Sequence, residues 1–202
     1  MIEVFDVTLP ELTGDEPRRA YVYLPEQAHD ARRRFPVLYM FDGHNVFFDE
    51  DATYGKSWGL GEYLDAQRVP LIVAAVECNH HPDFGRISEY SPLSFEAPRF
   101  GRIEGRGAQT MEWLVQAFKP MVDSRYPTRS DRRHTFIAGS SMGGLMSLYA
   151  LGEYNQVFSR AAALSPSIGF GASTLDAMLK NADFAPGTVL YMDFGEKEMK
   201  SH

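Results

Sequence analysis

The chain has 202 residues, of which 44% are hydrophobic and 13% aromatic, and its formal net charge is -7. This composition argues against a disordered chain and predicts a single globular domain over residues 1–202. The acidic balance also disfavours nonspecific binding to nucleic acid or to anionic membranes, because both favour basic patches.

Cysteine content and the N-terminus bear on the cellular compartment. The only cysteine, Cys78, excludes an internal disulfide and fits the cytosol. The N-terminal residues lack the basic, apolar and small-residue regions of a secretory signal. No apolar run approaches the ~18 residues that span a bilayer. We therefore expect a cytoplasmic protein with no membrane partner.

The predicted strands fall into two groups. Alternating residues at 2–9 and 19–25 predict an antiparallel pair joined by a polar turn. Short continuous apolar runs follow, and they are typical of strands buried on both faces of a parallel sheet: 36–41, 71–76, 135–139, 160–165 and 188–195.

Predicted helices lie between these strands, at 58–67, 108–126, 144–154 and 173–182. We expect Pro120 to kink or divide the second of them. The alternation predicts an α/β fold with a mostly parallel central sheet, an N-terminal antiparallel hairpin and helices on both faces. The stretch 78–107 shows no clear periodicity, and we expect a long loop that forms a wall of a substrate pocket.

The segment "GSSMG" (139–143) matches the G-x-S-x-G pattern with Ser141 at its centre. A predicted strand enters it and a predicted helix leaves it, which is the context of a nucleophile elbow. The backbone N–H of Met142, at the helix N-terminus, would then point at a developing oxyanion. The alternative is a turn in which Ser141 merely caps the helix. Ser140 occupies a variable position of the motif and is the lesser candidate for nucleophile.

The loop after the third predicted strand contains "DGHN" (42–45). In α/β-hydrolase sheets this loop supplies the second oxyanion donor, and the backbone N–H of His44 is our candidate. The alternative is an ordinary Asp42-Gly43 turn with His44 at the surface.

Metal binding is not predicted. The acidic residues 49–51 lack the spacing of a calcium loop. His80 and His81 have no third ligand at zinc spacing along the sequence. We therefore assign no metal.

Together these residues resemble the putative esterase family of α/β-hydrolases, which includes S-formylglutathione hydrolase, feruloyl esterases, siderophore esterases and mycolyltransferases. The resemblance runs in family order from about residue 35 to 198, and "GSSMGGLMSLYA" is its most specific part. The other matching pieces are "VLYMFDGHNVFF", "SWGLGEYLD", "GRISEYSP", "FKPMVDSRYPT", "AALSPSIGF" and "VLYMDFGEKE".

The resemblance implies Ser141 as nucleophile and the backbone amides of Met142 and His44 as the oxyanion hole, with no cofactor. It also implies that Arg86, Glu89 and Tyr90 of "GRISEYSP" order the loop beside the active site. A salt-bridged surface loop is an equal alternative. Trp58 either lines the pocket or packs beneath it in the core. The substrate-pocket candidates are Asp42, Trp58, Arg86, Glu89 and Tyr90.

The catalytic acid and histidine should follow the serine in chain order. Aligning "DFGEKE" with the family's D-x-G-x-x-[DE] places Glu198 in the acid position, with Glu196 as the nearer alternative and a solvated charged tail as the other reading. Only His202 follows Glu198, and four residues reach at most ~14 Å, so the histidine is not identified.

Three explanations remain open for the histidine. The chain is C-terminally truncated, or it is a homologue that has lost hydrolysis, or His80 or His81 serves as the base. We favour truncation, because a sheet that ends after an acid loop leaves its last strand uncovered.

The sequence thus predicts a serine carboxylesterase that cleaves small-molecule esters through an acyl-enzyme on Ser141. The alternatives are a catalytically silent α/β-hydrolase-like binding protein and an acyltransferase. The acyl group and the alcohol are not readable, and the oligomeric state stays open, with a homodimer as one option.

Overall fold

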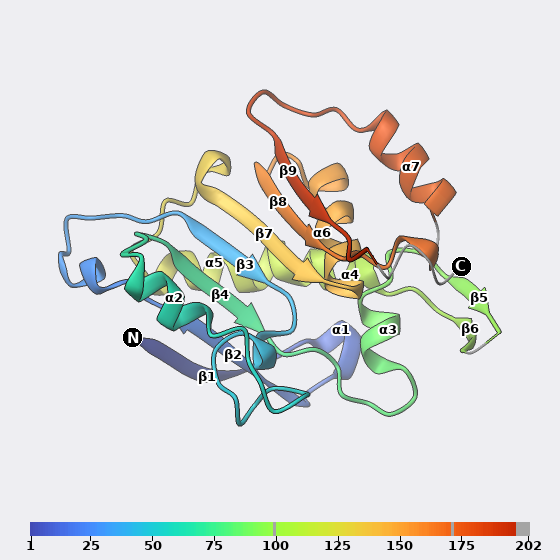
Figure 1. The fold of residues 1–202 in the computed structure, drawn as a ribbon, viewed down its shortest axis with the longest axis horizontal. Coiled ribbons are helices and arrows are strands. Elements are labelled where there is room, and N and C mark those ends of the chain that lie inside the picture. Colours follow the sequence, from blue (N-terminus) through green and yellow to red (C-terminus); the bar gives the residue numbers. More distant parts are fainter. Residues whose placement is uncertain (99, 171, 197–202) are drawn as a thin grey trace.

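A computed structural model describes residues 1–98, 100–170 and 172–196. Its centre is a seven-stranded sheet in the order β1-β2-β4-β3-β7-β8-β9 (Figure 1). β2 pairs antiparallel with both β1 and β4, whereas the remaining pairs are parallel. The predicted α/β fold is therefore confirmed. The strands are β1 (Ile2–Thr8), β2 (Pro17–Tyr23), β3 (Val37–Met40), β4 (Ile72–Val76), β7 (Thr135–Ser140), β8 (Arg160–Leu164) and β9 (Val189–Asp193).

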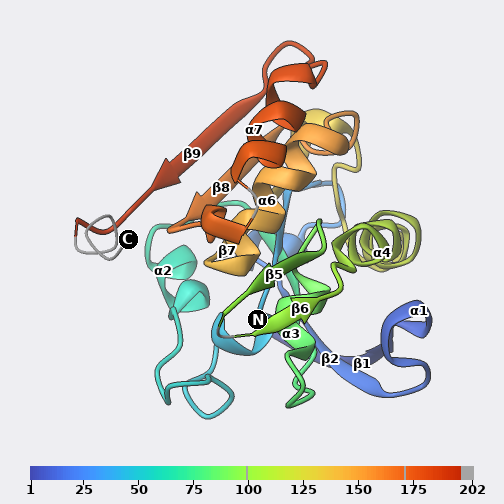
Figure 2. The ribbon, with the colours of Figure 1, turned by 90° about the vertical axis from the view of Figure 1, so that its right-hand side faces the viewer.

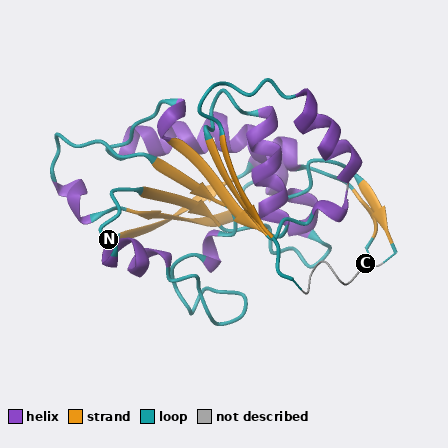
Figure 3. Cartoon of the chain, turned by 45° about the horizontal axis from the view of Figure 1, so that its top comes forward, coloured by secondary structure: helices purple, strands orange, loops and turns teal. Residues whose placement is uncertain are grey.

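Helices cover both faces of this sheet, whose strands fan out with the usual twist (Figure 3). One face packs against α4 (Gly107–Trp113), α5 (Lys119–Arg125) and α6 (Met142–Glu153) through a large apolar core. The other face packs against α2 (Leu60–Ala66) and the loop that precedes it. Figure 2 shows α2 on the opposite side of the sheet from α4. The short α1 (Pro10–Thr13) lies between β1 and β2, where a turn was expected.

The predicted kink at Pro120 is replaced by a wide helical turn. The segment Leu114–Phe118 is a π-helix between α4 and α5, and Lys119 N–H donates to Leu114 O, five residues back. A proline removes one donor and its ring clashes with the carbonyl four residues earlier. The wider turn accommodates both defects, so the chain stays helical from Gly107 to Arg125.

The stretch 78–107 is not a continuous loop. It contains α3 (Gly85–Glu89), the antiparallel pair of β5 (Phe95–Ala97) and β6 (Gly101–Ile103), and the start of α4. The prediction of an irregular loop was wrong here because elements of three to five residues are too short to produce a readable periodicity.

The last described strand, β9, is poorly covered. Val189, Leu190, Tyr191 and Met192 are 42% to 56% exposed, whereas Ala163 on neighbouring β8 is fully buried. The helix α7 (Ala172–Asn181) packs against α6, where Met178 and Leu179 lie close to Gly152. Among the described residues, no helix is both long and apolar enough to cross a membrane.

Candidate active site

Ser141 lies at the sharp turn between β7 and α6, and its backbone conformation is unusual. Its φ of 56° and ψ of -118° belong to a region that side-chain-bearing residues rarely occupy. Two hydrogen bonds hold it there: Ser141 N–H donates to Leu164 O at 3.0 Å, and Ser167 N–H donates to Ser141 O at 3.0 Å. The loop after β8 therefore fixes the strained turn.

Close backbone approach explains the glycines of the motif. A Cβ on Gly139 would lie 2.6 Å from the backbone carbon of Gly143, closer than real Cβ atoms come. A Cβ on Gly143 would lie 3.0 Å from the Phe41 Cβ. The turn can close this tightly only because both positions lack a side chain.

The Ser141 side chain is exposed and does not cap the helix. Its hydroxyl oxygen lies 3.0 Å from that of Ser167. Ser141 thus occupies the N-cap position of α6 without a side-chain capping hydrogen bond. Met142 is the first residue of α6 and is buried, so its N–H is among those that have no acceptor within the helix. The sequence did not single out Ser167, because no motif marks a serine that directly follows Ser165-Pro166.

The loop after β3 passes directly against β4. A Cβ on Gly43 would lie 2.9 Å from the backbone of Val76, and Asp42 adopts the left-handed conformation with φ 58°. This path buries His44, which is only 3% exposed, so the alternative that places His44 at the surface is wrong. His44 Nε2 contacts Thr53 Oγ1 at 3.1 Å, and burial lowers the pKa of the ring.

Arg86 ties this loop to the elbow. Its Nε and Nη2 donate to the two carboxylate oxygens of Asp42 at 2.6 and 2.7 Å, and Nη2 lies 3.5 Å from Ser140 O. Burial opposes the charge of Arg86, but the hydrogen bonds and charge of Asp42 outweigh it and raise the pKa of the guanidinium. The pair thus connects the ends of β3 and β7 from a residue on α3.

Glu89 and Tyr90 are also buried. Both carboxylate oxygens of Glu89 accept hydrogen bonds from Arg18 of β2, at 2.8 and 2.7 Å. The Tyr90 hydroxyl accepts the Asp42 N–H at 3.2 Å. Since Glu89 is 3% and Tyr90 2% exposed, a salt-bridged surface loop does not describe this segment. Arg18 was missed, because nothing in "PRRAYVY" distinguishes it from its exposed neighbour.

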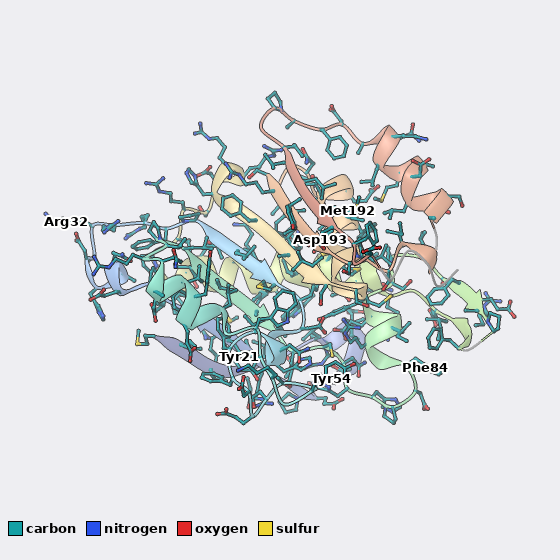
Figure 4. The ribbon with its side chains drawn as sticks, in the orientation of Figure 1. Tyr21, Arg32, Tyr54, Phe84, Met192 and Asp193 are labelled. Carbon is teal, nitrogen blue, oxygen red and sulfur yellow. The ribbon has the colours of Figure 1, made fainter. Side chains whose placement is uncertain are left out.

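Trp58 and Asp193 complete the set of residues considered for the site. Trp58 is 49% exposed, so the alternative that it packs in the core is wrong, and its place in a substrate pocket stays a prediction. Asp193 ends β9 (Figure 4), and its backbone oxygen and Oδ1 accept the N–H of Ser165 at 3.1 and 3.0 Å. The predicted acid, Glu198, and His202 lie outside the described residues.

The histidines make their contacts away from Ser141. His134 pairs with Asp131 at 2.7 Å immediately before β7, at the opposite end of that strand from the elbow. His81 lies 3.8 Å from Asp83, whereas His80 packs against the ring of His44 with centroids 4.7 Å apart. Within the part of the chain that the structure describes, the partner of the Ser141 hydroxyl is Ser167.

A surface cavity of 560 Å³ lies between the β5 segment and the chain that follows β8. It is lined by the β5 segment from Leu93 to Pro98, by Gly169 and by Thr174. Gly169 follows Ser167, the partner of Ser141, by two residues. The stretch predicted to form a pocket wall therefore lines a cavity, and its use by a substrate stays a prediction.

Known proteins of similar sequence and structure share this arrangement of the chain. YbbA of Bacillus subtilis (strain 168), named as an uncharacterized protein, is 25% identical over 187 residues, which is 90% of this chain and 69% of YbbA. An IroE-like serine hydrolase from Shewanella oneidensis superposes with a TM-score of 0.71 at 19% identity, over 95% of this chain and 60% of its own length. The siderophore hydrolase EstA from Aspergillus nidulans superposes with a TM-score of 0.72 at 17% identity, over 100% of this chain and 71% of EstA.

These structures establish the likeness of fold, and this chain spans less than two thirds of the Shewanella hydrolase. The family model described as "Putative esterase" matches residues 13–187, which include β2 through α7 and the whole elbow. The chain therefore belongs to the Putative esterase family.

Proposed function

We propose that the protein is a serine carboxylesterase that cleaves small-molecule esters through an acyl-enzyme on Ser141. The observation that carries this proposal is the exposed Ser141 hydroxyl on a strained turn, held by hydrogen bonds from the loop after β8. Strain of this kind persists where the surrounding structure enforces it, and it concentrates at functional sites.

The reaction would proceed in two steps. Ser141 Oγ attacks the ester carbonyl and gives up its proton to a base, and the tetrahedral oxyanion is held by the N–H groups of Met142 and His44. Collapse of that intermediate expels the alcohol, which takes up the proton, and leaves the acyl group on Ser141. Water then attacks the acyl-enzyme, which releases the carboxylic acid and restores the serine.

The substrate class follows from the relatives and from the cavity. EstA is named a siderophore hydrolase, and another structure of similar fold is named a ferulic acid esterase. The cavity of 560 Å³ beside the loop after β8 has the size of a small-molecule pocket, roughly 300–1,000 Å³. Both support an ester of a small acid.

A catalytically silent binding protein is the second candidate. It is favoured by the contact between Ser141 and Ser167, since a hydroxyl cannot replace the general base that a serine nucleophile needs. Glu198 remains the predicted acid, and the histidine that would serve as the base is not identified. An acyltransferase would use the same acyl-enzyme and differ only in the acceptor that replaces water.

Labelling with a fluorophosphonate tests the nucleophile. We expect the full-length protein to gain one adduct by intact mass spectrometry, and Ser141→Ala to gain none. Ser140→Ala is the matched control, because it removes the neighbouring hydroxyl and should label like the wild type. An adduct that persists in Ser141→Ala would overturn the assignment of Ser141.

Turnover separates the two candidate functions. With p-nitrophenyl acetate and methyl ferulate, an esterase releases product continuously and loses this activity in Ser141→Ala. A silent binding protein would show no turnover above the rate of Ser141→Ala. That second result would reject the esterase proposal in favour of the binding protein.

A further inference from the structure

Three potential metal ligands from the loops after β3 and β4 lie close together. They are His44, which follows β3, and Cys78 and His80, which follow β4. One donor atom from each lies within 4.8 Å of those of the other two. β3 and β4 are parallel neighbours, so both loops start at the same edge of the sheet, where Figure 1 shows them side by side. The backbone of Gly43 also lies directly against that of Val76, which brings the two loops together.

Among the described residues, one nitrogen of the His44 ring has no hydrogen-bond partner. This atom is the buried Nδ1, and the whole residue is 3% exposed. Nε2 contacts the Thr53 hydroxyl at 3.1 Å, which can accept its hydrogen. In that neutral tautomer Nδ1 carries a free lone pair. A neutral imidazole whose other nitrogen is anchored in this way is the form that binds metals.

His80 is held in a matching way. Its Nε2 lies 3.7 Å from the carboxylate of Glu77, and its Nδ1 lies 4.0 Å from the sulfur of Cys78. The Arg19 N–H donates to the same carboxylate at 2.9 Å and fixes its position. A carboxylate on the Nε2 side of the ring leaves Nδ1 facing the cluster, as in carboxylate–histidine–zinc arrangements.

The distances between the three donor atoms suit tetrahedral coordination of a cation if the atoms move slightly closer together. With bond lengths of about 2.0–2.1 Å to nitrogen and 2.3 Å to sulfur, tetrahedral ligands stand roughly 3.3–3.7 Å apart. The observed separations of 4.0 Å for one pair and at most 4.8 Å overall need movements of about an ångström. The exposed His80 side chain can make that movement. One thiolate with two imidazoles favours Zn²⁺ over the hard cations Mg²⁺ and Ca²⁺.

We propose that His44, Cys78 and His80 form a Zn²⁺ site with three protein ligands and one open position. On binding, the Cys78 thiol transfers its proton to the solvent and the sulfur coordinates as thiolate. Sequence spacing alone did not reveal this site, because His44 is 34 residues from Cys78 along the chain. The site does not depend on the esterase proposal. If that proposal holds, His44 binds the metal through its ring and the oxyanion through its backbone N–H.

The test is metal binding by the full-length, tag-free protein after treatment with a chelator. We expect titration with Zn²⁺ against a competing indicator to give one tight site per chain. His80→Ala should weaken binding at least ~100-fold, and Glu77→Gln should weaken it ~10-fold through loss of the outer contact. His81→Ala, which removes the adjacent exposed histidine, should bind like the wild type.

Substitution with Co²⁺ provides an independent readout. The loaded protein should show the near-ultraviolet charge-transfer absorption of a thiolate–Co²⁺ bond, and Cys78→Ser should lack it. Either the absence of tight Zn²⁺ binding in the wild type or equal affinity in His80→Ala would overturn the proposal. A wild type that binds Co²⁺ without the thiolate absorption would overturn it as well. Circular dichroism of each variant shows whether the fold is intact.

Discussion

The pair between Arg86 and Asp42 should be the ion pair most costly to break near the elbow. Arg86→Met removes two short charge-assisted hydrogen bonds and leaves the Asp42 carboxylate, whose side chain is 7% exposed, without its partner. Breaking a buried pair typically costs about 3–5 kcal/mol. Because the Arg86 side chain is 31% exposed, water replaces part of the interaction, and we expect a loss of about 2–4 kcal/mol.

Urea denaturation followed by circular dichroism measures this loss. With a slope of about 2 kcal/mol per molar urea, the midpoint should fall by about 1–2 M. Arg32→Met is the matched control, because Arg32 pairs with Asp30 at the surface, where the two side chains are 91% and 38% exposed. Its effect should stay below about 0.5 kcal/mol.

The double variant Arg86→Met/Asp42→Asn separates the pair from its surroundings. Removing the stranded charge should recover part of the loss, so the two changes should not be additive. If Arg86→Met shifts the midpoint no more than Arg32→Met does, the argument that this buried pair secures the loop after β3 is wrong.

Three further predictions concern the elbow, the core and the amino end of β7. Gly139→Ala should destabilise the fold by about 1–3 kcal/mol, because the new methyl group meets the backbone of Gly143, which cannot rotate away; an unchanged melting temperature would contradict this. Tyr39→Phe should be neutral or stabilising by up to about 1 kcal/mol in urea denaturation, because the buried Tyr39 hydroxyl has no hydrogen-bond partner among the residues that the structure describes, and a clear loss of stability would contradict it. The His134 hydrogen bond lowers the pKa of Asp131 below 3.8, so its stabilisation is present above that pH and is lost as the pH falls through the lower value. Asp131→Asn should therefore flatten the pH dependence of the melting temperature below pH ~4. The corresponding change in the free energy of unfolding should be less than about 1 kcal/mol, because the pair lies near the surface.

Local pattern predicted most of the sheet but not the short elements. The continuous apolar runs identify all five parallel strands, because strands that belong inside a parallel sheet are apolar throughout. β9 has this pattern although its side chains are exposed. The elements between residues 78 and 107 were not predicted, because α3, β5 and β6 are too short to show a hydrophobic periodicity. The helical chain across Pro120 also escaped, because the π-helical turn that accommodates the ring carries no sequence mark.

The candidate site also has one part that the local sequence predicts and another that depends on the tertiary structure. The sequence by itself determined the strand–turn–helix around Ser141, because every requirement of that turn, from the entering strand to the glycines, lies within a few neighbouring residues. Only the tertiary structure decided which distant side chains pair: Arg86 with Asp42, Arg18 with Glu89, and His44 with the cluster at Cys78. These pairs depend on which strands are neighbours and where they end. The burial that makes a lone charge or ring nitrogen significant exists only once the sheet has formed.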